Sequence, residues 1–297
     1  MNSMNKGELC ILVACYNRVA ITLPNLSRLV EALVMADQPN RLFVLDDASP
    51  DGTGDEVSRL FPQAIVLVSE GNLFWNRGMN RLFNKAREHG PFAAYLMFND
   101  DVTVEAGAVK ECMSSWLQLN RDEPTTLVGA TQSFESERIT YSGLRVRWKN
   151  APLSVYPVEP DGTLQLVDTF NANFVIIPAE TLEHLGGTDP YYWHSFGDID
   201  LGLSISALGQ KIYVARRPIG RCEDRPIGVA SRHGLRSRLI NGLSGRQNPK
   251  QNIYLTYKHA PNKLTASLVI GRMLIKRLIL LARNGPHEMP GSADAKR

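Results

Sequence analysis

The chain has 297 residues, enough for one large α/β domain or for a domain with an appended subdomain. Hydrophobic residues make up 43% and charged residues 21%, an ordinary globular composition, and a net charge of +3 does not indicate nucleic-acid binding. The charge is uneven, since the only acids between Lys211 and Arg283 are Glu223 and Asp224. The last third is therefore basic, which favours contact with the phosphates of a ligand or of lipid head groups.

No targeting or membrane-spanning segment is predicted. The N-terminal residues lack the apolar core of a signal peptide, and no segment reaches about 18 uncharged apolar residues. The four cysteines form neither a C-x-x-C pair nor a zinc spacing with histidine, which is typical of reduced cytosolic thiols. We therefore expect a cytoplasmic protein.

Strands and helices alternate four times over residues 9–117. Buried strands are predicted over residues 9–14, 42–45, 64–68 and 93–98. Four helices are predicted between and after these strands. The first begins at a cap on Thr22, and the second follows the turn at Asp51-Gly52 as far as residue 60. The other two span residues 79–88 and 104–117. This order predicts a mostly parallel sheet with helices on both faces, whose ligands bind outside the carboxyl ends of the strands.

After residue 117 the pattern changes. Strands are predicted over residues 127–131, 170–177 and 211–215, and a helix over residues 199–208 has Gly209 as its C-cap. Residues 216–252 are basic and loop-like, and a last helix covers residues 264–283. The expected division is a main domain over residues 1–220 and a basic C-terminal extension over residues 221–297.

Two acidic clusters follow predicted strands. In Asn99-Asp100-Asp101 the adjacent carboxylates repel each other unless a cation lies near them, and their oxygens suit Mg²⁺ or Mn²⁺. In Asp46-Asp47 a carboxylate can accept a hydrogen bond from a base N–H or a ribose hydroxyl. A polar turn with solvated acids explains either cluster equally well.

Five segments in order resemble the inverting family 2 glycosyltransferases of the GT-A nucleotide-diphospho-sugar fold, and within them a bacterial subgroup acting on surface polysaccharide. Each motif alone is weak, and five in order over about residues 9–220 are specific. They are Val13-Ala14-Cys15-Tyr16-Asn17-Arg18, Asp46-Asp47-x-Ser49-x-Asp51, Asn72-Leu73-Phe74-Trp75-Asn76-Arg77-Gly78-Met79-Asn80, Asn99-Asp100-Asp101 and Phe196-Gly197-Asp198-Ile199-Asp200-Leu201-Gly202-Leu203.

The resemblance implies metal-dependent transfer of a sugar from a UDP- or dTDP-sugar to a hydroxyl of a glycan or lipid-linked glycan, in O-antigen or capsule synthesis. It implies that Asp46 or Asp47 holds the base, with Tyr16 and Asn17 in the nucleotide-binding segment. It further implies that Asp100 approaches the ribose or the metal and that Asp101 ligates Mg²⁺ or Mn²⁺. Trp75 and Arg77 are expected in a loop whose backbone N–H groups meet phosphate.

The chain departs from the family pattern at two positions. Asn99 replaces the first acid of the D-x-D motif, and Gly197-Asp198 replaces the catalytic Glu-Asp pair. Asp198 is thus the one carboxylate that matches the base, which takes the proton of the acceptor hydroxyl. We expect it just before a helix whose N-terminus favours its ionised form, although a simple N-cap is the alternative.

Further polar and aromatic residues are candidates for acceptor contacts. Each also has a structural explanation: a polar strand end, a core aromatic residue, or stabilisation of a first helical turn. The candidates are Asn171, Asn173, Trp193, His194 and Asp200.

The C-terminal helix and the loop before it are basic. Arg272, Lys276 and Arg283 fall within about 40° on a helical wheel, and most of the helix is apolar. Such a helix suits the inner face of a membrane, or it packs on the main domain or on a second subunit in a homodimer. Three roles are open for the cations of the loop: they close over the diphosphate, they guide an anionic acceptor, or they form a solvated face. These cations are Arg232, Arg236, Arg238, Arg246 and Lys250.

Two other functions remain open. A sugar-nucleotide pyrophosphorylase also uses an α/β nucleotide fold and Mg²⁺, but it needs a glycine-rich loop after the first strand, where this chain has Cys15-Tyr16-Asn17-Arg18. A non-catalytic nucleotide- or carbohydrate-binding protein with a degenerate GT-A fold would explain the two departures. The retained Asp101 and Asp198 argue against it.

Overall fold

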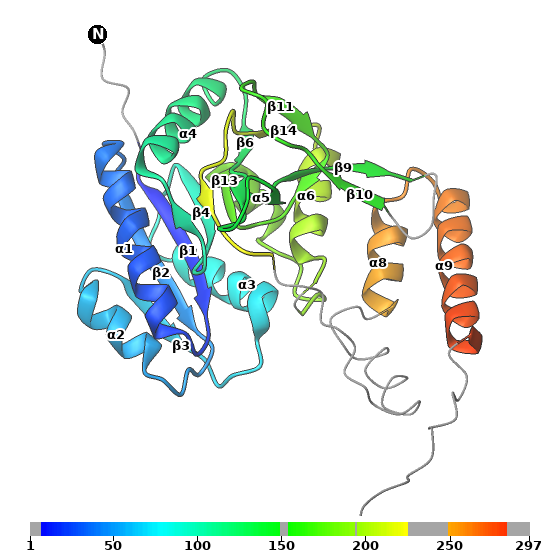
Figure 1. The fold of residues 1–297 in the computed structure, drawn as a ribbon, viewed down its shortest axis with the longest axis horizontal. Helices are drawn as coiled ribbons and strands as arrows, with labels where there is room; N and C mark the ends of the chain where they lie inside the picture. Colours follow the sequence, from blue (N-terminus) through cyan, green and yellow to red (C-terminus); the bar gives the residue numbers. More distant parts are fainter. Residues whose placement is uncertain (1–6, 149–153, 194, 225–248, 284–297) are drawn as a thin grey trace, which may run out of the picture.

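The structure is a computed structural model that describes residues 7–148, 154–193, 195–224 and 249–283. Its centre is an eight-stranded sheet in the order β11-β14-β6-β13-β4-β1-β2-β3 (Figure 1). The strands are β1 (Leu9–Cys15), β2 (Asn40–Asp46), β3 (Ile65–Val68), β4 (Ala94–Asn99), β6 (Thr125–Val128), β11 (Gln165–Val167), β13 (Phe174–Pro178) and β14 (Lys211–Val214).

Six of these eight strands run in one direction. β1 pairs in parallel with β2 and β4, β2 with β3, and β6 with β14. β13 is antiparallel to both β4 and β6, and β11 is antiparallel to β14. The predicted mostly parallel sheet is confirmed.

Helices cover both faces of the sheet because its strands are apolar on both sides. Leu9, Ile11 and Val13 of β1 point into a core shared with α1, α2 and α4, whereas Cys10 and Leu12 point into a second core shared with α3, α5 and α6. This is the pattern of a parallel strand buried on both faces. The helices are α1 (Val19–Met35), α2 (Thr53–Leu60), α3 (Phe74–Arg87), α4 (Ala106–Leu119), α5 (Ala179–Leu185) and α6 (Gly197–Ala207).

Two small sheets extend the main one. One has the order β10-β9-β12, from β9 (Gly143–Arg147), β10 (Ser154–Pro157) and β12 (Thr169–Phe170). The other has the order β5-β15-β7-β8, from β5 (Thr103–Val104), β7 (Thr131–Gln132), β8 (Ile139–Tyr141) and β15 (Gly220–Arg221). β15 spans the division expected at residue 220, so the main body continues past that point.

The C-terminal extension contains α8 (Pro249–His259) and α9 (Lys263–Arg283), which lie beyond α6 at the right of Figure 1. α8 contacts α6 on one side and α9 on the other. The sequence missed α8, because residues 249–252 read as loop. Of the basic loop, Arg232, Arg236, Arg238 and Arg246 lie outside the described residues. None of the helices in the described part of the chain is long and apolar enough to span a membrane.

Three helices begin earlier than the sequence predicts. α1 begins at Val19 rather than at a cap on Thr22, α3 at Phe74 rather than at residue 79, and α6 at Gly197 rather than at residue 199. For α1 and α3 the free N–H groups of the first turn are bound by carboxylates distant in sequence, so no local cap marks the start. The strand predicted over residues 170–177 is also divided into β12 and β13.

Candidate active site

A cleft of about 990 Å³ opens at the carboxyl ends of β1, β2 and β4. It joins residues from seven parts of the chain, as expected where parallel strands end. The predicted site residues in its lining are Tyr16, Asp47, Trp75, Asp101, Asn171, Asn173 and Asp198. The other predicted residues lie outside that lining: Asn17, Asp46, Arg77, Asp100, Trp193 and Asp200. His194 is not among the described residues.

Two acids after β2 organise the backbone around the cleft. Asp46 is buried and accepts hydrogen bonds from the Ser49 N–H and hydroxyl and from the Gly54 N–H. Asp51 accepts from the Thr53 hydroxyl, which lowers the pKa of its carboxyl, and from the Val19 N–H at the start of α1. The polar-turn interpretation therefore describes Asp46, which lies outside the cleft lining.

Asp47 faces the cleft and also holds the start of α3. Its carboxylate accepts from the Ser69 hydroxyl at 2.6 Å, the Leu73 N–H at 3.1 Å and the Phe74 N–H at 3.0 Å. A helix N-terminus favours such a negative charge. Of the two acids expected to hold the nucleotide base, Asp47 is the one in the cleft lining, and its contact with a base stays a prediction.

Arg18 supplies a positive charge between the two adjacent acids after β4. Its guanidinium lies 2.7 Å from Asp100 Oδ1 and 2.8 Å from Asp101 Oδ2. Asp100 is buried, and its Oδ2 also accepts from the Thr22 hydroxyl at 2.6 Å. Asp100 lies outside the cleft lining, and its contact with a ribose or a metal stays a prediction.

Asp101 and Asn99 present their side chains to the cleft. The Asn99 Oδ1 accepts from the Trp75 indole N–H at 2.8 Å, and Asp101 Oδ1 accepts from the Cys222 thiol at 3.7 Å. Within the described ranges no three His, Cys, Asp or Glu side chains gather into a metal site. One carboxylate is sufficient where substrate phosphates and waters complete the coordination of Mg²⁺, so Asp101 fits a metal held jointly with a phosphorylated ligand.

Asp198 occupies the first turn of α6 and also lines the cleft. Its Oδ1 accepts from the Ile199 N–H at 2.9 Å, and the Asn171 amide nitrogen lies 3.5 Å from its Oδ2. Burial is the largest influence and raises the pKa of its carboxyl, although the Ile199 N–H lowers it. The N–H at the start of α6 favours the ionised form as expected, but burial outweighs it. The N-cap alternative is wrong, because Phe196 is the N-cap.

The glycine in place of the family's glutamate has a steric explanation. A Cβ at Gly197 would lie 1.9 Å from Asn76 Oδ1, so a larger residue fits only if the Asn76 side chain moves. Asn76 is buried and donates to the carbonyls of Asp189 and Tyr192 at 2.7 and 2.8 Å, fixing the segment that leads into α6. No local pattern in the sequence indicates this role of Asn76.

Trp75 and Arg77 lie in the first turn of α3 rather than in a phosphate-binding loop. The N–H groups of Leu73 and Phe74, at the start of α3, are donated to Asp47. The Arg77 Nε donates to the Pro190 carbonyl at 3.0 Å, and its guanidinium lies 4.5 Å from the Trp193 ring centroid. Arg77 thus supports the segment before α6, outside the cleft lining.

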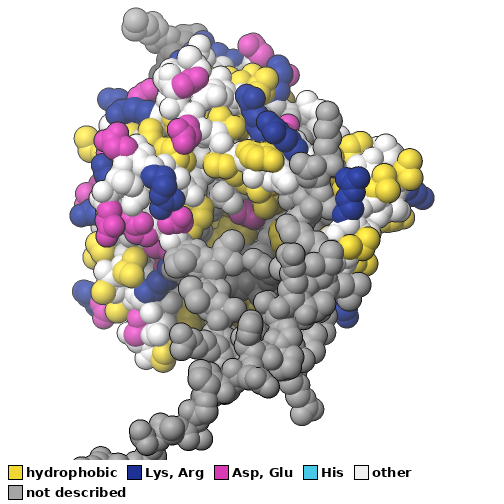
Figure 2. Space-filling view, turned by 45° about the vertical axis from the view of Figure 1, so that its right-hand side comes forward, with side chains coloured by type: hydrophobic (Ala, Val, Ile, Leu, Met, Phe, Trp, Pro, Cys, Tyr) yellow, Lys and Arg dark blue, Asp and Glu magenta, His cyan; other side chains and the backbone are white. Residues whose placement is uncertain are grey.

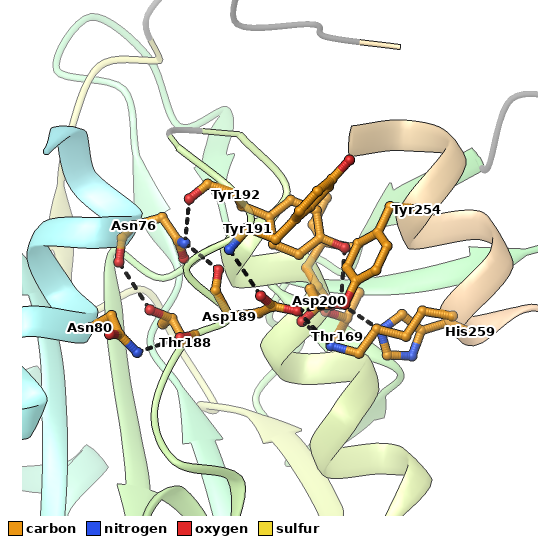
Figure 3. A network of polar contacts seen from close by, with 12 residues as sticks. Asn76, Asn80, Thr169, Thr188, Asp189, Tyr191, Tyr192, Asp200, Tyr254 and His259 are labelled. Atoms are coloured by element: carbon orange, nitrogen blue, oxygen red, sulfur yellow. Dashed lines mark hydrogen bonds and ion pairs between the residues drawn. The ribbon is translucent and has the colours of Figure 1, made fainter. Parts of the chain in front are cut away.

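Asp200 fastens the C-terminal extension to the main body (Figure 3). Its buried carboxylate lies 2.8 Å from Lys258 Nζ and 2.7 Å from His259 Nε2, both on α8, and accepts from the Tyr192 hydroxyl at 3.1 Å. Burial alone would raise the pKa of Asp200, but the hydrogen bonds from His259 and Lys258 outweigh it and lower the pKa. Its role is therefore a contact between helices rather than acceptor orientation.

The N-terminal half of the chain matches a known protein family. Residues 10–150, 141 of the 297 residues, match the family model described as Glycosyl transferase family 2. No curated protein matches the chain.

The fold is shared with solved glycosyltransferase structures. The mannosyltransferase PcManGT from Pyrobaculum calidifontis, in complex with GDP-Man and Mn²⁺, is 16% identical with a TM-score of 0.51, and the match covers 95% of this chain and 77% of that one. S. aureus TarS 1–349 in complex with UDP-GlcNAc is 12% identical with a TM-score of 0.55, covering 94% and 74%. The α/β fold is therefore of the predicted GT-A type.

Proposed function

We propose that this chain is a glycosyltransferase that transfers a sugar from a nucleoside diphosphate to an acceptor hydroxyl with inversion. The match of residues 10–150 to the family model and the shared fold support this proposal. The observation that carries the proposal is Asp198. It is a carboxylate of raised pKa that lines the same cleft as Asp47 and Asp101. A raised pKa makes it a better proton acceptor near neutral pH.

We assign the steps of an inverting displacement to this chain's own residues as follows. The donor lies over the strand ends, near Tyr16, Asp47 and Asp101. The acceptor enters from the α6 side, and its oxygen attacks C1 of the sugar while Asp198 takes the hydroxyl proton. The bond from C1 to the diphosphate breaks on the other face, which inverts the configuration. Asn171 orients the Asp198 carboxylate from 3.5 Å.

A divalent metal, Mg²⁺ or Mn²⁺, would be held by Asp101 and the diphosphate, where it would neutralise the charge that develops on the leaving group. Arg18, also in the cleft lining, would supply further positive charge there. The structural relatives support this part of the proposal, since one holds GDP-Man with Mn²⁺ and another UDP-GlcNAc. A UDP- or dTDP-sugar remains the proposed donor.

The proposed acceptor is a glycan or lipid-linked glycan of surface polysaccharide synthesis, reached at a membrane surface. α9 exposes Leu264, Leu268 and Ile275 by more than half, and they fall within about 40° on its wheel. Residues 249–283 contain seven Lys and Arg and no Asp or Glu. Two such basic faces repel each other, so an anionic bilayer suits this surface better than a second copy does.

The direct test begins with a thermal-shift panel of UDP-, dTDP- and GDP-sugars with Mn²⁺, in which the donor raises the melting temperature. With that donor, Asp198→Asn is expected to slow transfer by about 10²–10⁴-fold, because the proton acceptor is lost. Calorimetry should show donor binding unchanged in Asp198→Asn, and weakened both by EDTA and in Asp101→Ala.

Asp161→Asn, a change in an exposed turn, is the matched control and keeps full activity. Turnover by Asp198→Asn at the control's rate would remove Asp198 as the base. Donor binding that is equal with and without chelator would remove the metal.

A further inference from the structure

One side of α8 binds the segment that leads into α6 (Figure 3). The Gln251 Nε2 donates to the Tyr191 carbonyl at 3.2 Å, and the Tyr254 hydroxyl donates to Asp189 Oδ2 at 3.0 Å. Further contacts reach Asp200, inside α6. The residues of α8 that make these contacts recur at helical spacing: Gln251, Tyr254, Lys258 and His259. α8 therefore holds the chain on both sides of the point where α6 begins.

The contact with Asp200 is made of charge and hydrogen bonds in a buried place. The Asp200 carboxylate is 2% exposed and lies 2.8 Å from Lys258 Nζ and 2.7 Å from His259 Nε2. A well-packed apolar contact would join two helices at least as stably, because the burial of charge is costly. Hydrogen bonds to a carboxylate also have direction, so this contact fixes the orientation of α6 as well as its distance from α8.

Asp198 and Asp200 belong to the same first turn of α6. With 3.6 residues per turn their side chains project about 200° apart, so Asp198 lines the cleft while Asp200 faces α8. The Asp200 N–H donates to the Phe196 carbonyl at 2.8 Å and closes this turn. From the β12 side, the Thr169 hydroxyl donates to the Ile199 carbonyl at 2.8 Å. A turn held between β12 and α8 tilts when one side is released, and the Asp198 carboxylate then moves with it.

We propose that Lys258 and His259 are positioning residues, which act through Asp200 to hold the first turn of α6 and, with it, the Asp198 carboxylate. This inference rests on the proposed function and adds to it a dependence of transfer on the C-terminal extension. A general base must lie within hydrogen-bond distance of the proton that it takes. A displacement of about 1 Å caused by a distant change can slow a reaction about 10²-fold. Loss of either contact therefore lowers kcat and leaves the donor site at the strand ends unchanged.

The test measures release of the nucleoside diphosphate from the donor found by thermal shift, with a methyl glycopyranoside or water as acceptor. Lys258→Met and His259→Ala should each lower kcat about tenfold to hundredfold, while the donor KM and the Kd of the nucleoside diphosphate change less than about twofold. His259→Gln keeps a side-chain N–H donor and should restore most of the kcat that His259→Ala loses. The matched control is Lys211→Met, because Lys211 forms an exposed pair with Glu123.

A second comparison separates positioning from stability. Leu33→Ala removes a fully buried side chain from α1 and should lower the melting temperature at least as much as Lys258→Met does. Assayed at a temperature where circular dichroism shows every variant folded, Leu33→Ala should keep the kcat of the wild type. A loss of kcat in Leu33→Ala equal to that in Lys258→Met would assign the effect to stability and overturn the positioning role.

The Asp198→Asn background gives the most direct readout. Because the positioning residues act through Asp198, Lys258→Met should leave the residual rate of Asp198→Asn unchanged, whereas independent effects multiply. The same fold-loss in both backgrounds would overturn the positioning role, as would kcat values of Lys258→Met and His259→Ala equal to that of Lys211→Met. Full turnover by Asp198→Asn, or a wild type that binds no nucleoside diphosphate, would refute the proposed function and the positioning role with it.

Discussion

At the scale of single residues, neighbouring acids in this chain have opposite environments. Asp198 lies in the cleft, and burial raises the pKa of its carboxyl. Asp200, two residues later, is more deeply buried, but hydrogen bonds from His259 and Lys258 keep its pKa low. Asp198 therefore binds a proton more readily than an ordinary aspartate does, whereas Asp200 stays charged as a structural anion. Asp198 and Asp200 are the same residue type, so their different roles come from the different groups that surround them.

The raised pKa of Asp198 predicts how transfer depends on pH. The base acts only when ionised, so kcat should fall as the pH is lowered through the raised pKa. The acid limb of the kcat profile should therefore lie above the pH of about 4 that is ordinary for aspartate. Steady-state kinetics between pH 4 and 8 measure this limb. An acid limb at the ordinary aspartate value would contradict the role of burial.

At the scale of elements, three helix N-termini meet around the cleft, and distant residues position each of them. Asp51 binds the first N–H of α1, and Asp47 binds the N–H groups at the start of α3. α6 is held from the other side by α8, through the contacts of Asp200 with Lys258 and His259. The C-terminal extension therefore supports the helix that carries Asp198.

The contact between α6 and α8 predicts an asymmetric effect of two identical substitutions. Lys258→Met removes a donor from a carboxylate that is 2% exposed, and should lower the free energy of unfolding by about 1.5–3 kcal/mol. Lys211→Met breaks an exposed pair with Glu123 and should cost at most about 1 kcal/mol. Urea unfolding of both variants at pH 7 measures the difference. Equal losses would show that the α6–α8 contact contributes no special stability.

At the scale of the whole molecule, the cleft and the basic surface occupy different parts of the chain. α8 and α9 lie at the right of Figure 1, and on the corresponding right-hand lobe of Figure 2 hydrophobic and basic side chains lie side by side. No acidic side chain is visible on that lobe in this view. A bilayer bound there would leave the helices on the far side of the sheet, such as α1, free of lipid.

This layout predicts binding to anionic membranes. The protein should sediment with phosphatidylcholine vesicles that contain phosphatidylglycerol, less so with pure phosphatidylcholine, and less at high salt. The double substitution Leu268→Asp and Ile275→Asp should abolish binding, because it places charge on the apolar face of α9. The matched control is Val34→Asp with Met35→Asp, exposed apolar residues on α1. Concentration-dependent dimers that the α9 variant alone disrupts, without vesicle binding, would favour a second copy instead.

Much of the fold and part of the site follow from local sequence. Apolar runs such as residues 9–14 predict buried strands because every residue in them is apolar, and polar residues at strand ends predict the cleft. These signals, with the family resemblance, predict a site that contains Asp47, Asp101 and Asp198, and all three lie in the cleft lining. The first residues of α1 and α3 could not be predicted from local sequence, because the carboxylates that bind their N–H groups come from residues 26 or more positions away.

By itself, the sequence determined the alternating α/β pattern, the family resemblance and the types of residue at the strand ends, since all three depend on neighbours along the chain. Only the tertiary structure decided between adjacent acids. In the folded chain Asp100 binds Thr22 of α1, Asp101 lines the cleft, and Asp200 binds Lys258 of α8. It also placed the Asn76 side chain where the Cβ of a larger residue at position 197 would lie, which explains the glycine there. The role of a carboxylate depends on burial and on the charges around it, and both come from segments far apart in the chain.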